Sequence, residues 1–241
     1  MALAGAALYR ASGDAAYLDD AKAFLGAVDV SYGVNPYYYV GPLAAADLCG
    51  GMGRPAVTRA DVRRLACDKL KEAADAAAYA TGLTAFGSPG GFYFGWVQGH
   101  TGNAAVAAAA ERAGVTAGGR RLAAGARDYL VGRNPWGASF VVGPEEGAAH
   151  RPYHALSLKG DPVALGRGLV VGGPAVAWQF PEFGITPNPS DRFAPYDPTY
   201  DSPLYSGRVI YEDQPGNFIN GEVGLAYSAP TVLLLAQLAA G

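Results

Sequence analysis

Apolar residues recur at helical spacing along most of the chain, and this pattern predicts a mainly helical protein. Between residues 58 and 81 the apolar positions fall three and four residues apart, which places them on one face of an α-helix. They are Val62, Leu65, Ala66, Leu70, Ala73 and Ala77. Similar patterns predict helices over residues 2–11, 14–28, 42–50, 101–114 and 116–131. A last helix is expected near the C-terminus, with Pro230 in its first turn and Ser228 as its cap.

Residues 132–211 interrupt this pattern, because they are rich in Gly, Pro, Trp and Tyr and have little helical period. Short strands are expected over residues 139–143 and 169–172. A loop region of this length inside a compact domain is usually functional. No linker divides the chain, so the sequence predicts a single domain over residues 1–241. The expected fold class is all-α, with about six to seven helices and one elaborated loop face.

Composition excludes several classes of partner. Half of the 241 residues are hydrophobic, 16% are charged, and the net charge is −3, which gives no reason to expect nucleic acid or an anionic membrane as a partner. The longest apolar run, at the C-terminus, is shorter than the ~20 residues that span a bilayer. The N-terminal residues are apolar but have no basic residue before them, so no signal peptide is visible.

The two cysteines, Cys49 and Cys67, are too few for a disulfide scaffold. They flank a predicted turn, which leaves a single bridge open without implying one. No histidine lies near either cysteine in the sequence, and this disfavours a zinc site.

Two carboxylates near the C-terminus are the strongest candidates for chemistry. Asp213 and Glu222 lie nine residues apart among aromatic residues, namely Tyr211, Phe218 and Tyr227. A carboxyl group beside apolar rings favours its protonated form and can serve as a general acid. Paired carboxylates beside aromatic rings suit the cleavage of glycosidic bonds. The alternative is that Asp213 caps a turn and Glu222 is a solvated loop residue, and spacing alone favours this alternative.

The same residues carry a resemblance to glycoside hydrolase family 9, the (α/α)₆-barrel family that includes many endoglucanases. The last signature of that family has aromatics, an aspartate and a glutamate in the register of Tyr211, Asp213, Phe218 and Glu222. Two positions depart from it: Gly224 stands where Ser, Thr or Ala is usual, and Ser228 stands where Asn is usual. Other phrases that agree are Leu8–Asp14, Gly102–Ala105, Asp128–Pro135 and Leu169–Pro174. The resemblance covers nearly the whole chain but about half of the family domain, the C-terminal half.

The resemblance implies hydrolysis of a β-1,4-glucan or a related β-glycan with inversion at the anomeric carbon. Glu222 would be the general acid, and Asp213 would assist it. Sugar contacts would come from Trp96, from Tyr211 and from the histidine signature of the family. That signature reads Pro-His-x-Arg, whereas this chain has Pro152-Tyr153-His154-Ala155 with His150-Arg151 upstream. Either His154 fills the histidine position, or His150 and Arg151 supply the imidazole and the guanidinium. Further candidates for stacking on sugars are Tyr93, Trp136, Trp178 and Tyr200.

One expected part of the machinery is missing from the sequence. The catalytic base of the family lies in an Asp-Ala-Gly-Asp phrase, and these 241 residues contain none. Asp19, Asp20 and Asp47 lie on predicted helices and are poor substitutes. We therefore expect the chain alone to be nearly inactive, as a fragment of a longer gene or as one part of a split enzyme that pairs with the N-terminal half-barrel.

The remaining expectations follow from the resemblance. The chemistry needs no cofactor, although structural calcium with unknown ligands is common in the family. Family members are mostly extracellular or periplasmic. Two alternatives stay open: a carbohydrate-binding remnant without catalysis, and another (α/α)-barrel enzyme such as a polysaccharide lyase or a sugar epimerase. Convergence of the two loop histidines in a cleft, instead of Glu222, would favour the second alternative.

Overall fold

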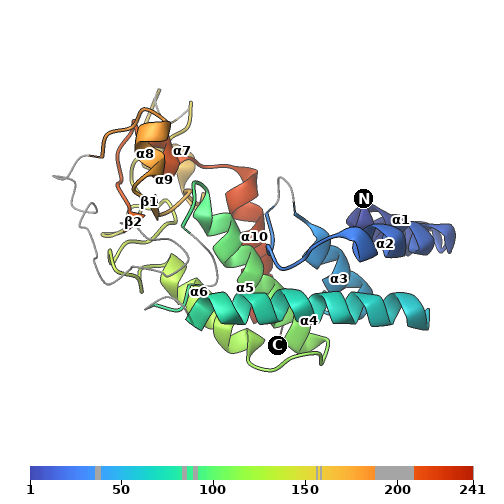
Figure 1. Cartoon of the computed structure of the whole chain (residues 1–241). Helices are drawn as coiled ribbons and strands as arrows, with labels where there is room; N and C mark the ends of the chain where they lie inside the picture. Colours follow the sequence, from blue (N-terminus) through green and yellow to red (C-terminus); the bar gives the residue numbers. More distant parts are fainter. Residues whose placement is uncertain are drawn as a thin grey trace. The chain divides into compact units, whose positions relative to one another are not determined.

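The computed structural model describes residues 1–35, 39–82, 86–88, 92–155, 157, 159–187 and 209–240 (Figure 1). Seven helices of nine or more residues account for most of this part: α1 Ala2–Ser12, α2 Ala16–Ala27, α3 Gly41–Cys49, α4 Ala60–Gly82, α5 Trp96–Arg112, α6 Gly119–Leu130 and α10 Leu225–Ala239. Three helices of four or five residues, α7 Pro162–Gly166, α8 Gln179–Glu182 and α9 Phe218–Gly221, lie in the loop region. The prediction of an all-α protein is confirmed.

The described chain forms two compact units. Unit 1 comprises residues 1–79, 102–124 and 233–241, and unit 2 comprises residues 80–101 and 125–232. The limits between the units fall inside α4, α5, α6 and α10. Each unit has a hydrophobic cluster of its own.

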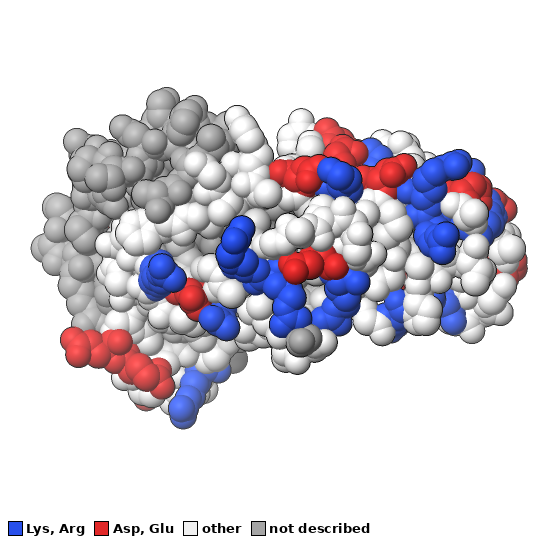
Figure 2. Space-filling model, turned by 90° about the horizontal axis from the view of Figure 1, so that it is seen from below, with Lys and Arg blue, Asp and Glu red and all other residues white. Residues whose placement is uncertain are grey.

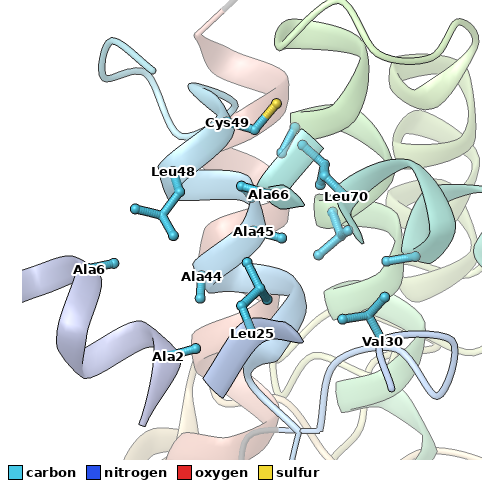
Figure 3. Close-up of a cluster of buried hydrophobic side chains, with 14 of the residues drawn as sticks. Ala2, Ala6, Leu25, Val30, Ala44, Ala45, Leu48, Cys49, Ala66 and Leu70 are labelled. Atoms are coloured by element: carbon cyan, nitrogen blue, oxygen red, sulfur yellow. The ribbon is translucent and has the colours of Figure 1, made fainter. Parts of the chain in front are cut away.

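Unit 1 is built from closely packed helices with many alanines. Helices α1 and α2 lie side by side (Figure 1), and a Cβ atom at Gly5 would come within 2.9 Å of the Tyr17 carbonyl oxygen. Glycine at this position therefore permits the close approach of the two helices. Figure 3 shows the shared core, in which Leu25 of α2 and Leu48 of α3 lie among small side chains.

A disulfide joins Cys49, at the end of α3, to Cys67 of α4, with their Cα atoms 5.0 Å apart. The bridge that the sequence left open is therefore formed. It links two helices that each contribute side chains to the core of unit 1.

The core of unit 2 is aromatic. Tyr129, Phe140 and Trp96 pack together with Tyr211, and each is at most 2% exposed. Hydrogen bonds between backbone groups hold the surrounding loops, for example from Val142 N to the Leu169 oxygen at 2.8 Å. The loops are thus ordered by a core of large rings and by isolated pairs of extended residues.

The prediction of strands over residues 139–143 and 169–172 is wrong in extent. These segments pair only at isolated positions, such as Val141 with Val170. The two-residue strands in the described residues are β1 Ala175–Val176 and β2 Val209–Ile210, which pair in antiparallel orientation. Irregular turns rich in glycine on either side keep the pairing too short for longer strands.

Two helix starts also differ from the prediction. Helix α5 begins at Trp96, five residues early. Helix α10 begins at Leu225, so that Pro230 lies inside the helix and Ser228 is not its cap. The first turn of α10 forms when the amides of Tyr227 and Ser228 donate to the Gly224 carbonyl oxygen. The hydrogen bond from the Tyr227 hydroxyl to the Glu222 carboxylate favours this earlier start over the capping signal at Ser228.

Charged side chains are mixed in sign on the surface. On the face drawn in Figure 2, Lys and Arg lie near Asp and Glu in small groups between uncharged residues. None of the helices in the described residues is both long enough and apolar enough to cross a membrane.

Candidate functional site

Glu222 is positioned by its backbone on both sides. It follows the short helix α9, and its amide donates to the Phe218 oxygen at 3.0 Å. Its carbonyl oxygen accepts from the Gly172 amide at 2.8 Å, and the residue pairs with Tyr153 in parallel orientation. The direction of the Glu222 side chain is therefore set by segments from three parts of the sequence.

The carboxylate of Glu222 is half-buried and is held by a phenol. The hydroxyl of Tyr227 donates to Glu222 Oε2 at 2.5 Å, and the Tyr227 side chain is 2% exposed. Tyr227 lies in the first turn of α10, and the helix therefore fixes the position of the Tyr227 side chain. The phenol therefore fixes the orientation of the carboxylate through Oε2.

Asp213 is buried and holds a loop through its backbone. Its Oδ2 accepts from the His150 amide and its Oδ1 from the Arg151 amide, both at 2.9 Å. The Arg151 guanidinium also contacts Gln214 Oε1 at 3.3 Å. A carboxylate that accepts two backbone N–H groups is a strong local anchor. Asp213 therefore anchors the backbone of residues 150 and 151.

A buried polar network that the sequence analysis missed supports this segment. The Glu212 side chain is 1% exposed, and its Oε2 accepts from Asn217 Nδ2 at 2.9 Å. Asn220 donates to the carbonyl oxygens of Gly173 and Ile210, and accepts from the Glu212 amide. In the sequence, the signal for this network was the run of amide and carboxylate residues between Tyr211 and Phe218, which is unusual for an exposed loop.

The two loop histidines have different surroundings. His150 lies next to Asp213, and its Nε2 lies 3.1 Å from the Glu145 carbonyl oxygen. His154 is exposed, three residues beyond the segment bonded to Asp213. Of the two alternatives for the histidine signature, His150 and Arg151 lie beside Asp213, whereas His154 directly follows Tyr153, which pairs with Glu222. Their contact with sugar stays a prediction.

Several of the predicted stacking residues are buried. Trp96 and Tyr211 are 2% and 1% exposed, and both belong to the aromatic core of unit 2. Trp136 is buried as well, whereas Tyr93 and Trp178 are exposed, and Tyr200 lies outside the described residues. Burial gives Trp96 and Tyr211 a packing role here, because their ring faces are covered by protein.

His100, which was not among the predicted site residues, is fully buried. It stacks on Trp96, and its Nε2 lies 3.0 Å from the Ala126 carbonyl oxygen. Since a carbonyl only accepts, Nε2 carries the proton, and Nδ1 can accept from the Ser88 hydroxyl at 3.4 Å. Burial lowers the pKa of His100 to about 4, and the hydrogen bond to Ala126 opposes this only in part. The ring is therefore neutral at physiological pH.

The aspartates considered as substitutes for the base take part in ion pairs or lie on exposed helix surface. Asp47 contacts the Arg10 guanidinium and is 8% exposed, and Asp19 contacts Arg59. Asp20 is exposed on α2. Within the described residues, no three His, Cys, Asp or Glu side chains gather as metal ligands would. The predictions on cofactors and calcium therefore stay untested.

Comparisons with known proteins agree with the fold and the motifs. A family model described as glycosyl hydrolase family 9 matches residues 1–235. Among solved structures, the chain is similar to AaCel9A in complex with cellobiose-like isofagomine, with 24% identity and a TM-score of 0.73. That likeness covers 99% of this chain and 42% of the other. A comparison with curated proteins finds no match.

Two further structures show the same likeness. One is a single-mutant thermostable endoglucanase from Alicyclobacillus acidocaldarius, with 24% identity and a TM-score of 0.69 over 98% of this chain and 42% of that one. The other is an endoglucanase from the termite Nasutitermes takasagoensis, with 20% identity and a TM-score of 0.68 over 98% and 49%.

The chain thus spans less than half the length of each of these three structures. Their likeness confirms the predicted fold, part of an (α/α)₆ barrel. Because the family model matches nearly the whole sequence, the chain belongs to glycosyl hydrolase family 9.

Proposed function

We propose that this chain supplies the general-acid part of an inverting glycoside hydrolase that acts on β-1,4-glucan. The observation that carries the proposal is the arrangement of Glu222, which is half-buried, fixed by its backbone, and held at Oε2 by the Tyr227 hydroxyl. The membership of the chain in family 9 supports the same reaction class. The similar protein AaCel9A binds a cellobiose-like isofagomine, which supports the substrate class.

In the proposed reaction, Glu222 donates the proton from Oε1 to the glycosidic oxygen as the bond between that oxygen and the anomeric carbon breaks. Water attacks the anomeric carbon from the opposite face and gives its proton to a base. In inverting enzymes the two carboxyl groups lie ~6.5–9.5 Å apart to admit this water. Tyr227 keeps Oε2 as the acceptor oxygen and thereby orients the acidic proton toward the substrate.

Asp213 has a positioning role in this proposal. By accepting from the amides of His150 and Arg151, it fixes the backbone of these two residues. The exposed guanidinium of Arg151 then offers donors to sugar hydroxyls. The base is proposed to come from residues outside these 241, since the sequence contains no Asp-Ala-Gly-Asp phrase. The chain alone should therefore be nearly inactive.

A complementation experiment tests the proposal. The chain is co-expressed with the part of a family 9 domain that contains an Asp-Ala-Gly-Asp phrase, and hydrolysis of cello-oligosaccharides is followed by NMR. We expect products of inverted configuration, and a loss of about 10²–10⁴-fold in kcat for Glu222→Gln. Glu146→Gln, which changes an exposed carboxylate, is the matched control.

A second substrate tests whether Glu222 acts as a general acid or has only a structural role. Dinitrophenyl β-cellobioside has a leaving group that needs no proton, so Glu222→Gln should lose little activity on it. An equal loss on both substrates would reject the acid role. Turnover by the isolated chain that disappears in Glu222→Gln would reject the proposal that the base lies elsewhere. Sugar binding without turnover in the complemented protein would instead favour a carbohydrate-binding remnant.

A further inference from the structure

Four aromatic side chains of unit 2 form a connected row at the surface. Tyr153 contacts Phe218 with ring centroids 5.6 Å apart, and Phe218 contacts Phe183 at 5.9 Å. Phe94 packs against both phenylalanines at 5.5 and 5.7 Å. Tyr153 and Phe183 are 39% and 46% exposed, whereas Phe94 and Phe218 are half-buried. The aromatic row therefore has two exposed rings supported by two inner ones.

One end of the aromatic row adjoins the proposed acid. Tyr153 pairs with Glu222 in parallel orientation, and the Tyr153 amide donates to the Gly221 oxygen at 2.7 Å. Directly paired residues on neighbouring extended segments carry their side chains on the same face. The Tyr153 ring and the Glu222 carboxylate therefore share one face of this pair of segments.

The chemistry around Tyr153 fits a sugar. An aromatic face offers an apolar surface of low conformational entropy cost, and the tyrosine hydroxyl remains at its edge for a hydrogen bond. Two residues before it, the exposed Arg151 provides further donors. An apolar ring flanked by a few polar groups is the usual composition of a small-molecule site. A pyranose presents the matching surface, with C–H groups on its faces and hydroxyls around its rim.

We infer that Tyr153 stacks on a glucosyl unit of the β-glucan bound beside Glu222, and that Phe183 contacts a glucosyl unit farther along the same glucan chain. Both exposed rings contact the half-buried Phe218, with ring centroids 5.6 and 5.9 Å apart, so Phe218 bridges Tyr153 and Phe183. The half-buried Phe218 contacts the Tyr153 ring and supports its position. The inference rests on the proposed function for its ligand, and it assigns the stacking role to residues other than the buried Trp96 and Tyr211.

Binding of cellotetraose to the 241-residue chain, measured by titration calorimetry, tests the inference without requiring turnover. Tyr153→Ala should weaken binding about 3- to 10-fold, the range expected for one aromatic contact. Tyr153→Phe should retain most of the affinity, because the ring remains. Phe183→Ala should weaken cellotetraose more than cellobiose, since only the longer ligand reaches the second ring.

Tyr79→Ala is the matched control, because Tyr79 is a 70% exposed tyrosine on α4 of unit 1. All variants must keep the far-UV spectrum and thermal midpoint of the parent. Equal affinities of the parent and Tyr153→Ala would overturn the inference and leave the proposed function standing. No binding of any β-glucan by the parent chain would overturn both. Self-association that Tyr153→Ala abolishes, with unchanged sugar affinity, would assign the row to a protein contact instead.

Discussion

At the scale of single residues, Asp213 has a structural task beside its proposed part in the site. Its two carboxylate oxygens accept one backbone hydrogen bond each, from consecutive residues more than sixty positions earlier. A carboxylate satisfies both amides at once, which an amide side chain does not, because one of its two termini is a donor. The carboxylate at this position is therefore required for the loop.

Asp213→Asn should accordingly lower the free energy of unfolding by about 2 kcal/mol, because one buried amide loses its charged acceptor. Urea denaturation measures this loss. Limited proteolysis between residues 143 and 155 should also be faster in the variant. Asp161→Asn serves as the control, because it makes the same aspartate-to-asparagine change at an exposed helix cap. An unchanged urea midpoint and unchanged proteolysis would contradict the anchoring role.

At the scale of elements, the disulfide joins two helices of unit 1 that also share a hydrophobic core. The bridge closes a chain segment in which the two cysteines are 18 positions apart. In the chain-entropy description, a loop of this size restricts the unfolded state by roughly 3 kcal/mol. Such bridges persist in oxidising compartments, which agrees with the extracellular or periplasmic location expected from the family resemblance.

Reduction should therefore shift the urea midpoint of the parent chain to lower concentration, by an amount corresponding to about 3 kcal/mol. The double variant Cys49→Ala and Cys67→Ala should unfold near the reduced parent and show no response to reductant. The two curves, with and without dithiothreitol, measure the effect directly. Identical midpoints of oxidised and reduced parent would show that the bridge adds no stability.

At the scale of the whole molecule, stability should depend on pH through His100. The pKa of this buried imidazole is about 4 in the folded chain, against an ordinary value of 6.5. Between these values the unfolded chain binds a proton that the folded chain does not, so the free energy of unfolding decreases as pH falls. The stability is fully present above pH 6.5, and a pKa difference of this size corresponds to roughly 3 kcal/mol lost by pH 4.

His100→Gln should remove this part of the pH dependence, because glutamine does not titrate. Urea denaturation of both proteins at pH 7 and at pH 4.5 provides the comparison. The parent should lose more stability between the two pH values than the variant. His154→Gln, which changes an exposed histidine, should behave like the parent. Parallel losses in the parent and His100→Gln would place the pH dependence elsewhere.

The long helices and the family motif could be predicted from the sequence alone. Helical spacing of apolar residues predicted the long helices, because burying one face of a helix is a local pattern repeated every three or four residues. The nine-residue spacing of Asp213 and Glu222 between aromatic positions indicated family 9, to which the chain belongs. These features depend on residues that are close in the sequence.

Tertiary structure decided the rest. The bonds from His150 and Arg151 to Asp213, from Tyr227 to Glu222, and the pairing of Tyr153 with Glu222 depend on how loops fold back on the aromatic core of unit 2. The same folding buries Trp96 and Tyr211 and exposes Tyr153. A ring has the same composition in a core and at a surface, so the sequence marked aromatic residues as candidates but could not separate the two roles. Only the packing of distant segments determines which ring faces solvent and which oxygen of a carboxylate is already bonded.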